Sequence, residues 1–556
     1  GHMLLGIDVG GTFTDAVIID GGAIISSAKR RTTKDNLMNG ITDALGAVMS
    51  GVDSAQIEQV TLSTTVVTNT IVEHKEQPVD LYVVAGPGRN VDDIFPVRPV
   101  YLKGYTDHRG IVVERTDVGG TRQLANMVQS KSGTDLAAVS TKFGVRNPKE
   151  EIDVAQALAD TYSTISTGSA LSGNLNFPRR TISAYFNSAV AAVFKEFKTA
   201  VYHALETFHI TAPVYILKAD GGSLPIDTVE SIPVETVFTG PAATVLGLEA
   251  LRSTKEAHTV ALDIGGTTTD ISLWKQGKPL MTKEGVSIRE YPSAVRSFAV
   301  TSVGIGGESA VRYEDGELMV GPERLGPSVA LGGTIPTLGD ALIVLGNAHY
   351  GDEQKAYDAI TQIDTTIDAK IMAQRIVDTA VRVVQQGIDT VVAKENKRPI
   401  YVVSDIVHPD PFVPAQLVIV GGTAASLGPI IGDTLGLPVH IPPDAAVANA
   451  IGAGVANHTM AITVHVDTKR RTMVVPELGI QDKGSSLRSA QAVEEVAYGL
   501  LREAAQEQGL VPQGVMPAIE TISVEDFPVV DGWQSMERII TVKVQLKAGV
   551  SSYVES

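Results

Sequence analysis

Short apolar runs joined through a Gly-Gly turn to a second apolar run occur at two distant places in the chain. Near the start, residues 4–9 indicate a buried strand, Gly10-Gly11 ends it, and residues 16–19 indicate a second strand. The polar stretch between them, residues 12–15, predicts a hairpin turn rather than the start of a helix. A Walker loop or a dinucleotide fingerprint opens a helix, and neither GxxxxGKS/T nor GxGxxG occurs here.

The same design returns in residues 260–273, where Asp263 and Asp270 stand in the places that Asp8 and Asp15 hold in the first hairpin. A repeat at this distance predicts two related halves that face each other across a cleft. Turns without bulky side chains expose backbone N–H groups and threonine hydroxyls that can hold phosphate oxygens. The predicted phosphate contacts at the two tips are Gly10, Gly11, Thr12, Gly265, Gly266, Thr267 and Thr268.

The remaining pattern predicts alternating helices and strands. Residues 238–248 and 444–456 are rich in small residues and predict two helices that can pack closely against other small-residue helices. Residues 417–420 predict a buried strand ended by Gly421-Gly422. Residues 179–208 predict one helix or two in series, and residues 356–394 predict helix.

Two stretches allow more than one interpretation. Thr64, Thr65 and Asn69 are polar positions inside an apolar run, so they either face a cleft or belong to a strand that favours threonine. Residues 86–120 are rich in Pro, Gly and Arg, which indicates a loop-rich insertion that could face a small molecule. Its charged side chains either recognise a substrate carboxylate or are solvated; they are Arg98, His108 and Arg109.

Composition narrows the classes of protein. The chain has 556 residues, a net charge of −18 and no cysteine. The negative charge argues against a nucleic-acid or anionic-membrane surface, and the lack of cysteine excludes disulfides, thiolate nucleophiles and zinc–thiolate sites. No apolar run reaches the roughly 18 residues of a membrane span, and no GxSxG elbow supports a serine hydrolase. We expect a cytoplasmic protein.

Five elements stand in a fixed order: the first hairpin, the small-residue helix at Gly240, the second hairpin, the strand ending at Gly421-Gly422, and the small-residue helix at Gly452. This order resembles the acetate and sugar kinase, heat-shock chaperone and actin superfamily. The resemblance implies an α/β fold with two duplicated actin-like ATPase (ribonuclease H-like) domains around an ATP cleft. We expect domains at residues 3–210 and 211–460, with a small α/β appendage at residues 461–556.

Within that superfamily, several motifs resemble the hydantoinase A and 5-oxoprolinase family. They are GIDVGGTFTDAV, TTVVTNTIVE, FTGPAATVLGL, LDIGGTTTDISL, PTLGDALIVLG and GGTAASLGP, and they cover nearly all of residues 3–460. The chain departs from the family at three places where a histidine is usual. The residues found there are Leu62-Ser63, Glu150 and Ser426-Leu427.

The resemblance implies ATP and Mg²⁺ as cofactors, with Asp8 and Asp263 holding the metal directly or through water. It places the adenosine against Gly421, Gly422 and Thr423, and adds Thr14, Gly306 and Gly307 to the nucleotide contacts. Asp15 and Asp270 either orient threonines and water or close their own turns. The general base is open between Asp340 and Glu308, each of which is equally well a hydrogen-bonded loop carboxylate.

The expected reaction is ATP-dependent opening of a cyclic amide such as a hydantoin, 5-oxoproline or another lactam. Transfer of the γ-phosphoryl group to the amide oxygen would turn an unreactive amide into an electrophile. The alternatives are an ATP-using subunit of a ketone carboxylase, a kinase with a stable phosphorylated product, and an actin- or chaperone-like ATP switch. The resemblance also implies a second, B-type subunit as partner, and we expect a homo-oligomer. From the net charge and the lack of a long apolar run we expect neither nucleic acid nor membrane as a partner.

Overall fold

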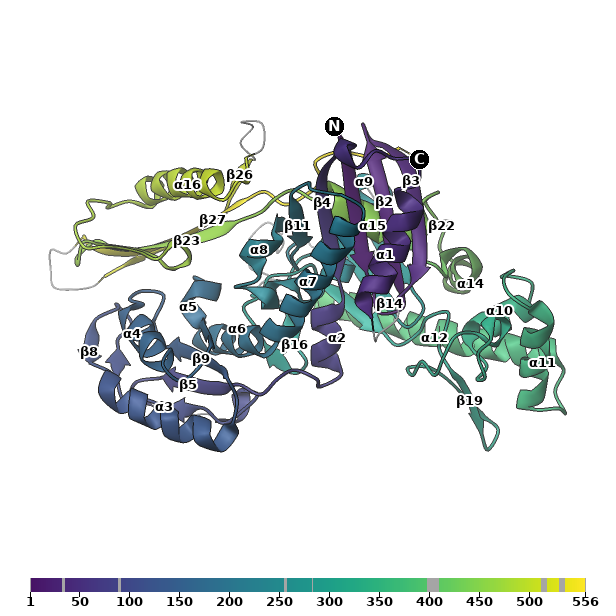
Figure 1. The fold of residues 1–556 in the computed structure, drawn as a ribbon, viewed down its shortest axis with the longest axis horizontal. Helices are drawn as coiled ribbons and strands as arrows, with labels where there is room; N and C mark the ends of the chain where they lie inside the picture. The colour runs from purple at the N-terminus through teal and green to yellow at the C-terminus, as the bar shows by residue number, and fades with distance from the viewer. Residues whose placement is uncertain are drawn as a thin grey trace.

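The computed structural model describes residues 2–32, 36–88, 92–254, 258–282, 284–397, 410–511, 518–529 and 536–555. It contains two related central sheets, an inserted α/β unit and a C-terminal sheet (Figure 1). Within these ranges, no helix has both the length and the apolar character needed to cross a membrane.

The sheet of the first half has the strand order β12-β11-β4-β1-β2-β3, in which β1, β2 and β3 are antiparallel neighbours and β4 and β11 run parallel to β1. The sequence places Gly10-Gly11 directly after β1, so the predicted hairpin is present. The strands are β1 (Met3–Val9), β2 (Phe13–Asp20), β3 (Ala23–Arg31), β4 (Ile57–Thr64), β11 (Val214–Leu217) and β12 (Ser223–Pro225).

The sheet of the second half repeats this order as β15-β14-β13-β21-β22, with β18 pairing with β14. The register repeats as well, because Asp8 lies opposite Asp15 and Asp263 lies opposite Asp270. The predicted duplicated actin-like fold is therefore confirmed. The strands are β13 (Thr259–Ile264), β14 (Thr269–Lys275), β15 (Lys278–Pro279), β18 (Val300–Val303), β21 (Gln416–Val420) and β22 (Val439–His440).

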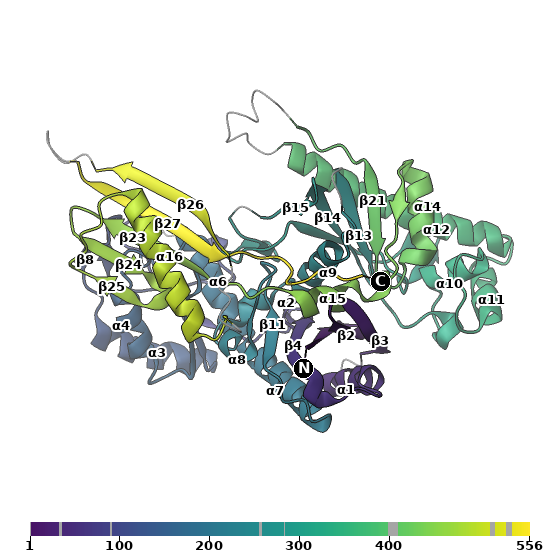
Figure 2. The same cartoon turned by 90° about the horizontal axis from the view of Figure 1, so that it is seen from above.

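Helices α9 (Thr239–Ala250) and α15 (Ala448–Val455) lie side by side between the two central sheets (Figure 2). Glycines allow this approach: a Cβ added to Gly452 would stand 1.8 Å from the carbonyl oxygen of Ala243, and one added to Gly247 would stand 2.0 Å from that of Ala448. The two helices are thus in backbone-to-backbone contact, as their composition predicted.

Other helices surround the sheets. The segment predicted as one helix or two is two, α6 (Phe177–Ala189) and α7 (Ala191–Thr207), and residues 356–394 also divide into two, α11 (Glu353–Ile363) and α12 (Ala369–Asn396). The helices around the central sheets are α1 (Leu37–Val48), α2 (Val66–Val72), α7 (Ala191–Thr207), α8 (Ile226–Val229), α10 (Leu338–Val344), α11 (Glu353–Ile363), α12 (Ala369–Asn396) and α14 (Ala424–Leu435).

An inserted unit follows α2 and has its own sheet, β10-β9-β5-β6. Its elements are β5 (Asp80–Val84), β6 (Val100–Tyr101), β7 (Tyr105–Thr106), β8 (Val112–Glu114), α3 (Val118–Ser132), β9 (Leu136–Thr141), α4 (Lys149–Leu158), β10 (Thr164–Thr167), α5 (Gly168–Leu171) and α6 (Phe177–Ala189). The first central sheet resumes with β11, so this half extends beyond residue 210, where the sequence suggested a boundary.

The C-terminal unit is a five-stranded sheet, β25-β24-β23-β27-β26, with helix α16 on one face. Its elements are β23 (Ala461–Asp467), β24 (Thr472–Val475), β25 (Ile480–Asp482), α16 (Ala490–Glu507), β26 (Ile519–Pro528) and β27 (Arg538–Leu546). After β27 the chain returns to the first half, where the N–H of Val554 bonds to the Ala250 carbonyl and Glu555 pairs with Ala23. Val554 is buried there against Val17 and Ile19.

Candidate functional site

A cleft of about 410 Å³ lies between the two halves. It is bounded by the tips of both Gly-Gly hairpins, by the start of α2, by the turn after β21 and by the start of α15. Its lining includes most of the residues predicted to hold phosphate, metal or adenosine: Asp8, Gly10, Gly11, Thr12, Asp15, Asp263, Gly265, Gly266, Thr267, Thr268, Gly421 and Gly422.

The two hairpin tips have the same local geometry. The N–H of Gly10 bonds to the Phe13 carbonyl at 2.9 Å, and the N–H of Gly265 bonds to the Thr268 carbonyl at 3.0 Å. The tips meet across the cleft, where the hydroxyl oxygens of Thr12 and Thr267 are 3.4 Å apart. Two sets of backbone N–H groups and hydroxyls therefore converge on one place, which is an arrangement suited to binding an anion.

Asp8 is a buried carboxylate at the base of the cleft. Its oxygens accept hydrogen bonds from Ser63 Oγ at 2.6 Å and from Asn449 Nδ2 at 2.7 Å. Burial, together with the nearby Asp15, raises the pKa of Asp8 to about 7. Asn449 reaches it from α15, so the helix contact between the halves also positions this carboxylate.

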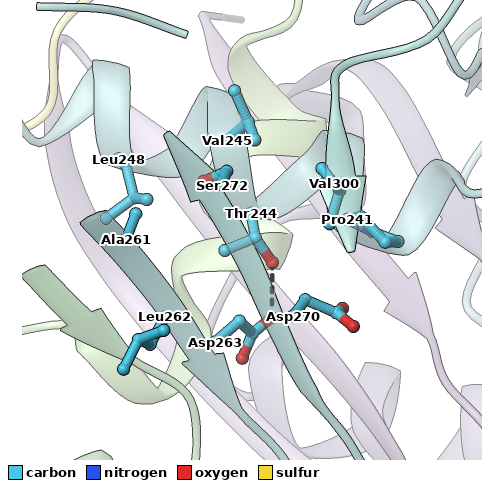
Figure 3. Close-up of a pocket in the computed structure, with 10 residues that line it drawn as sticks. All are labelled: Pro241, Thr244, Val245, Leu248, Ala261, Leu262, Asp263, Asp270, Ser272 and Val300. Carbon is cyan, nitrogen blue, oxygen red and sulfur yellow. Dashed lines mark hydrogen bonds between the residues drawn. The ribbon is translucent and has the colours of Figure 1, made fainter. Parts of the chain in front are cut away.

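Asp263 occupies the equivalent place in the second half. Its Oδ2 accepts a hydrogen bond from Thr244 Oγ1 of α9 at 2.6 Å (Figure 3). Burial raises the pKa of Asp263. Burial and the neighbouring Asp263 carboxylate together raise the pKa of Asp270 to about 7. Asp270 lies opposite Asp263 on β14 and accepts a hydrogen bond from Ser302 at 2.7 Å.

Asp15 forms an ion pair with Lys29 of β3 at 2.7 Å, and its pKa is raised by burial in spite of this cation. The Lys29 ammonium also lies 5.1 Å from the centre of the Phe13 ring. Both Asp15 and Lys29 line the cleft. Asp15 therefore has a side-chain partner from a neighbouring strand.

Some predicted site residues lie outside this lining. Thr14 is buried and its hydroxyl bonds to that of Thr32 at 2.8 Å. Gly307 donates its N–H to the Gly265 carbonyl at 2.9 Å, and the Thr423 hydroxyl approaches the same carbonyl at 3.3 Å. Gly307 and Thr423 thus contact the backbone of the second hairpin. Gly306 packs against it as well, because an added Cβ there would stand 2.4 Å from the Thr267 nitrogen.

Asp340 is fully buried at the start of α10 and is not brought to the cleft. Its carboxylate accepts hydrogen bonds from the N–H groups of Val329, Ala330 and Thr337, and from the Thr337 hydroxyl, at 2.9–3.0 Å. Four donors to one carboxylate form a helix cap and a loop anchor. This geometry gives Asp340 a structural role.

Glu308 is also buried, and both of its carboxylate oxygens contact guanidinium groups. Oε1 accepts from Arg31 at 2.6 Å and Oε2 accepts from Arg324. Neither oxygen can take a proton from water or substrate without breaking an ion pair. Arg109, a candidate for recognising a carboxylate, forms a two-pronged pair with Asp467 of the C-terminal unit at 3.0–3.2 Å.

The stretch that allowed two interpretations is divided in the structure. Thr65 and Asn69 line the cleft, whereas Thr64 is the buried last residue of β4. Sequence analysis missed Lys29, which lies opposite Asp15 on β3. Extending the predicted hairpin by one more strand would have identified it. The other missed side chains came from distant segments: Thr244, Arg324 and Asn449 line the cleft, and Ser63 donates to Asp8.

The positions that lack the expected histidines lie in β4, at the start of α4 and in α14. Leu62 is buried in β4, Glu150 accepts the Thr116 N–H at 2.8 Å from the start of α4, and Ser426-Leu427 lie in α14. None of them is among the residues that line the cleft in the described part of the chain. The cleft lining is thus built without these positions.

The chain matches two family models and is similar in sequence to known proteins. Residues 180–462 match the model for the hydantoinase/oxoprolinase family, and residues 4–162 match the model for the hydantoinase/oxoprolinase N-terminal region. The chain is 26% identical to caprolactamase subunit alpha of Pseudomonas jessenii over 382 residues, which cover 62% of this chain and 54% of that protein. It is 25% identical to the acetophenone carboxylase gamma subunit of Aromatoleum aromaticum, covering 85% of this chain and 70% of that subunit.

Two solved structures share the fold. The nucleotide-free acetone carboxylase structure superposes with a TM-score of 0.71 at 16% identity, covering 99% of this chain and 88% of that one. The ATP-dependent caprolactamase from Pseudomonas jessenii superposes with a TM-score of 0.68 at 20% identity, covering 97% and 87%. By sequence, the chain spans about half the length of the caprolactamase subunit and 30% of the length of 5-oxoprolinase 1 of Arabidopsis thaliana.

Proposed function

This chain belongs to the hydantoinase/oxoprolinase family, and from that premise we propose that it uses ATP to open a cyclic amide. The observation that carries the proposal is the meeting of two Gly-Gly-Thr hairpins, with hydroxyls 3.4 Å apart, above the carboxylates of Asp8 and Asp263. Such a site binds the phosphates of a nucleotide rather than a neutral molecule.

The phosphates would contact Gly10, Gly11 and Thr12 from one side, and Gly265 to Thr268 from the other. The adenosine would lie against Gly421 and Gly422, whose turn lines the same cleft. A Cβ added to Gly422 would meet nothing within 4 Å, so the backbone there is open to a flat ring system, whereas one added to Gly421 would stand 2.4 Å from the Ile264 carbonyl oxygen.

Mg²⁺ would accompany the nucleotide. Asp263 Oδ2 is bonded to Thr244, and both oxygens of Asp8 accept hydrogen bonds, so these carboxylates suit an ion that keeps its own waters. Mg²⁺ is usually bound by one or two carboxylates plus phosphates rather than by a protein cage. Consistent with this, the described residues contain no group of three or more metal-binding side chains. The bound ion would neutralise phosphate charge.

In the proposed reaction, the amide oxygen forms a bond to the γ-phosphorus while the bond to the β,γ-bridging oxygen breaks and its electron pair leaves with ADP. Water then adds to the activated carbon and the ring C–N bond breaks, with a proton passing to the nitrogen. A second water hydrolyses the resulting acyl phosphate. The products are an open amino acid, ADP and phosphate.

A ketone carboxylase subunit is the second candidate. The match to the acetophenone carboxylase gamma subunit spans more of this chain than the match to caprolactamase, and both relatives are named as subunits. A partner subunit and self-association are proposed on the same ground. An ATP switch without metabolic substrate is the third alternative.

The test is phosphate release from Mg-ATP with a panel of hydantoins, 5-oxoproline, larger lactams, and ketones with bicarbonate. The Asp8→Asn, Asp263→Asn double variant is the blank, and Asp358→Asn on the exposed face of α11 is the matched control. Stimulation by a cyclic amide that is lost only in the double variant supports the proposal. Stimulation only by a ketone favours the carboxylase, and failure to bind ATP refutes the site.

A further inference from the structure

We propose that Arg324 contacts the phosphoryl group of ATP during its transfer, and that Glu308 positions Arg324 in a way that depends on both halves of the molecule. The choice of acceptor rests on the proposed function. The contact with the nucleotide does not, and it can be tested separately.

Arg324 is the cationic side chain that the second half contributes to the cleft lining in the described chain. The first half contributes Lys29, whose ammonium is already paired with Asp15 at 2.7 Å. A guanidinium group has five N–H donors, and Arg324 uses its Nε on Glu308. Its other donors have no recorded partner among the described residues, and its side chain is 30% exposed. They are therefore available to an anion in the cleft.

Glu308 connects Arg324 to the second hairpin. Its backbone N–H bonds to the Gly266 carbonyl at 2.7 Å, directly behind the turn that faces Thr12. The Glu308 side chain is 8% exposed, and its Oε2 accepts from Nε of Arg324 and so fixes one edge of the guanidinium. The cation is thus held beside the predicted phosphate site by a residue that is bonded to that site's backbone.

Arg31 makes the arrangement depend on the first half. It is the last residue of β3, and its guanidinium reaches across to Glu308 Oε1 at 2.6 Å. The same group lies 5.1 Å from the centre of the Phe13 ring in the first hairpin. Glu308 is therefore shared by cations from both halves, and Arg324 is fully positioned only while the halves are this close.

The chemistry of transfer gives this cation a role. As the bond to the bridging oxygen breaks, negative charge spreads over the oxygens of the phosphoryl group and the leaving ADP. The planar donors of arginine match phosphate oxygens better than a lysine does. A cation lowers the barrier to the extent that its contact strengthens as this charge develops, and this is the role proposed for Arg324.

The first experiment compares Arg324→Gln and Arg324→Lys with wild type. We expect kcat for ATP cleavage to fall by about 100-fold or more in Arg324→Gln, as for loss of a transition-state donor, while ADP affinity changes by less than about threefold. Binding of ADP with aluminium fluoride, which mimics the group in transfer, should weaken far more than binding of ADP. Arg324→Lys should recover part of kcat.

The matched control is Arg312→Gln, because Arg312 also pairs with a glutamate, Glu323, but does not line the cleft. It should behave as wild type. If Arg324→Gln retains kcat within about threefold, or loses ADP and ADP–aluminium fluoride binding equally, the proposal is overturned. Circular dichroism and the thermal midpoint identify any variant that has not folded, in which case Arg324→Lys decides.

The second experiment tests the positioning role of Glu308. Glu308→Gln should lower kcat without changing ADP affinity, and the loss in the Glu308→Gln, Arg324→Gln double variant should be no greater than in Arg324→Gln alone. Additive losses would show that Glu308 acts independently of Arg324. If no cyclic amide stimulates the wild type, the proposed function fails, while the aluminium fluoride comparison still tests Arg324.

Discussion

The contact between α9 and α15 leads to a sharp prediction for Gly452→Ala. A Cβ at this position would stand 1.8 Å from the Ala243 carbonyl oxygen, and the obstacle is backbone, so no side chain can rotate away. The helices would have to separate by about 1.5 Å to restore an ordinary contact. Overpacking of this kind costs about 1–3 kcal/mol, and we expect the upper end of that range.

The measurement is thermal unfolding together with nucleotide binding. A loss of about 3 kcal/mol lowers the midpoint of a unit of 150–250 residues by roughly 6–12 °C. Nucleotide affinity should fall as well, because α15 carries Asn449, which donates to Asp8 at 2.7 Å. The matched control is Gly499→Ala in α16, where an added Cβ meets nothing within 4 Å.

In Gly499→Ala the substitution should raise stability by about 0.5–1 kcal/mol, because alanine restricts the unfolded chain and favours helix. The two variants should change the free energy of unfolding in opposite directions, which separates the effect of packing from the effect of helix propensity. A Gly452→Ala protein with an unchanged or higher midpoint and wild-type nucleotide affinity would refute the close approach of these helices.

Three further changes have defined outcomes. Asn449→Ala leaves an oxygen of buried Asp8 without its donor, at a cost of about 1–3 kcal/mol, and calorimetric titration should show weaker ATP binding than in wild type. Arg109→Ala should lower the thermal midpoint through loss of the Asp467 pair but leave KM for the cyclic amide unchanged; a raised KM would return Arg109 to the substrate site. Burial lowers the pKa of His465 from 6.5 to about 3, so below pH 6.5 the unfolded chain binds a proton that the folded chain does not. The contribution of His465 to stability is then lost as the pH falls, by about 2 kcal/mol at pH 5, so the thermal midpoint of His465→Gln relative to that of wild type should rise between pH 7 and pH 5.

The fold could be predicted because its main signal is local and repeated. Each hairpin consists of consecutive residues, and the turn closed by Gly10 and Phe13 recurs at Gly265 and Thr268. The close helix pair also follows from composition, since only small residues permit backbone contact. These features require no knowledge of what lies opposite in space.

The side chains that complete the site could not be predicted in the same way. Asn449 reaches Asp8 over 441 positions of sequence, and Arg31 reaches Glu308 over 277. The roles of the carboxylates were the hardest to predict, because the sequence does not show how many hydrogen-bond donors surround each one. Asp340 has four close hydrogen-bond donors, and Glu308 contacts two guanidinium groups.

The return of the chain end to the first half has a consequence for synthesis. The face of the first hairpin sheet that carries Val17 and Ile19 is covered by residues of α15 and finally by Val554. A ribosome adds roughly 5–20 residues per second, so this apolar face waits from about half a minute to nearly two minutes for its cover. We expect chaperones to bind the nascent first half during that time, and slower translation of the last third should increase aggregation rather than reduce it.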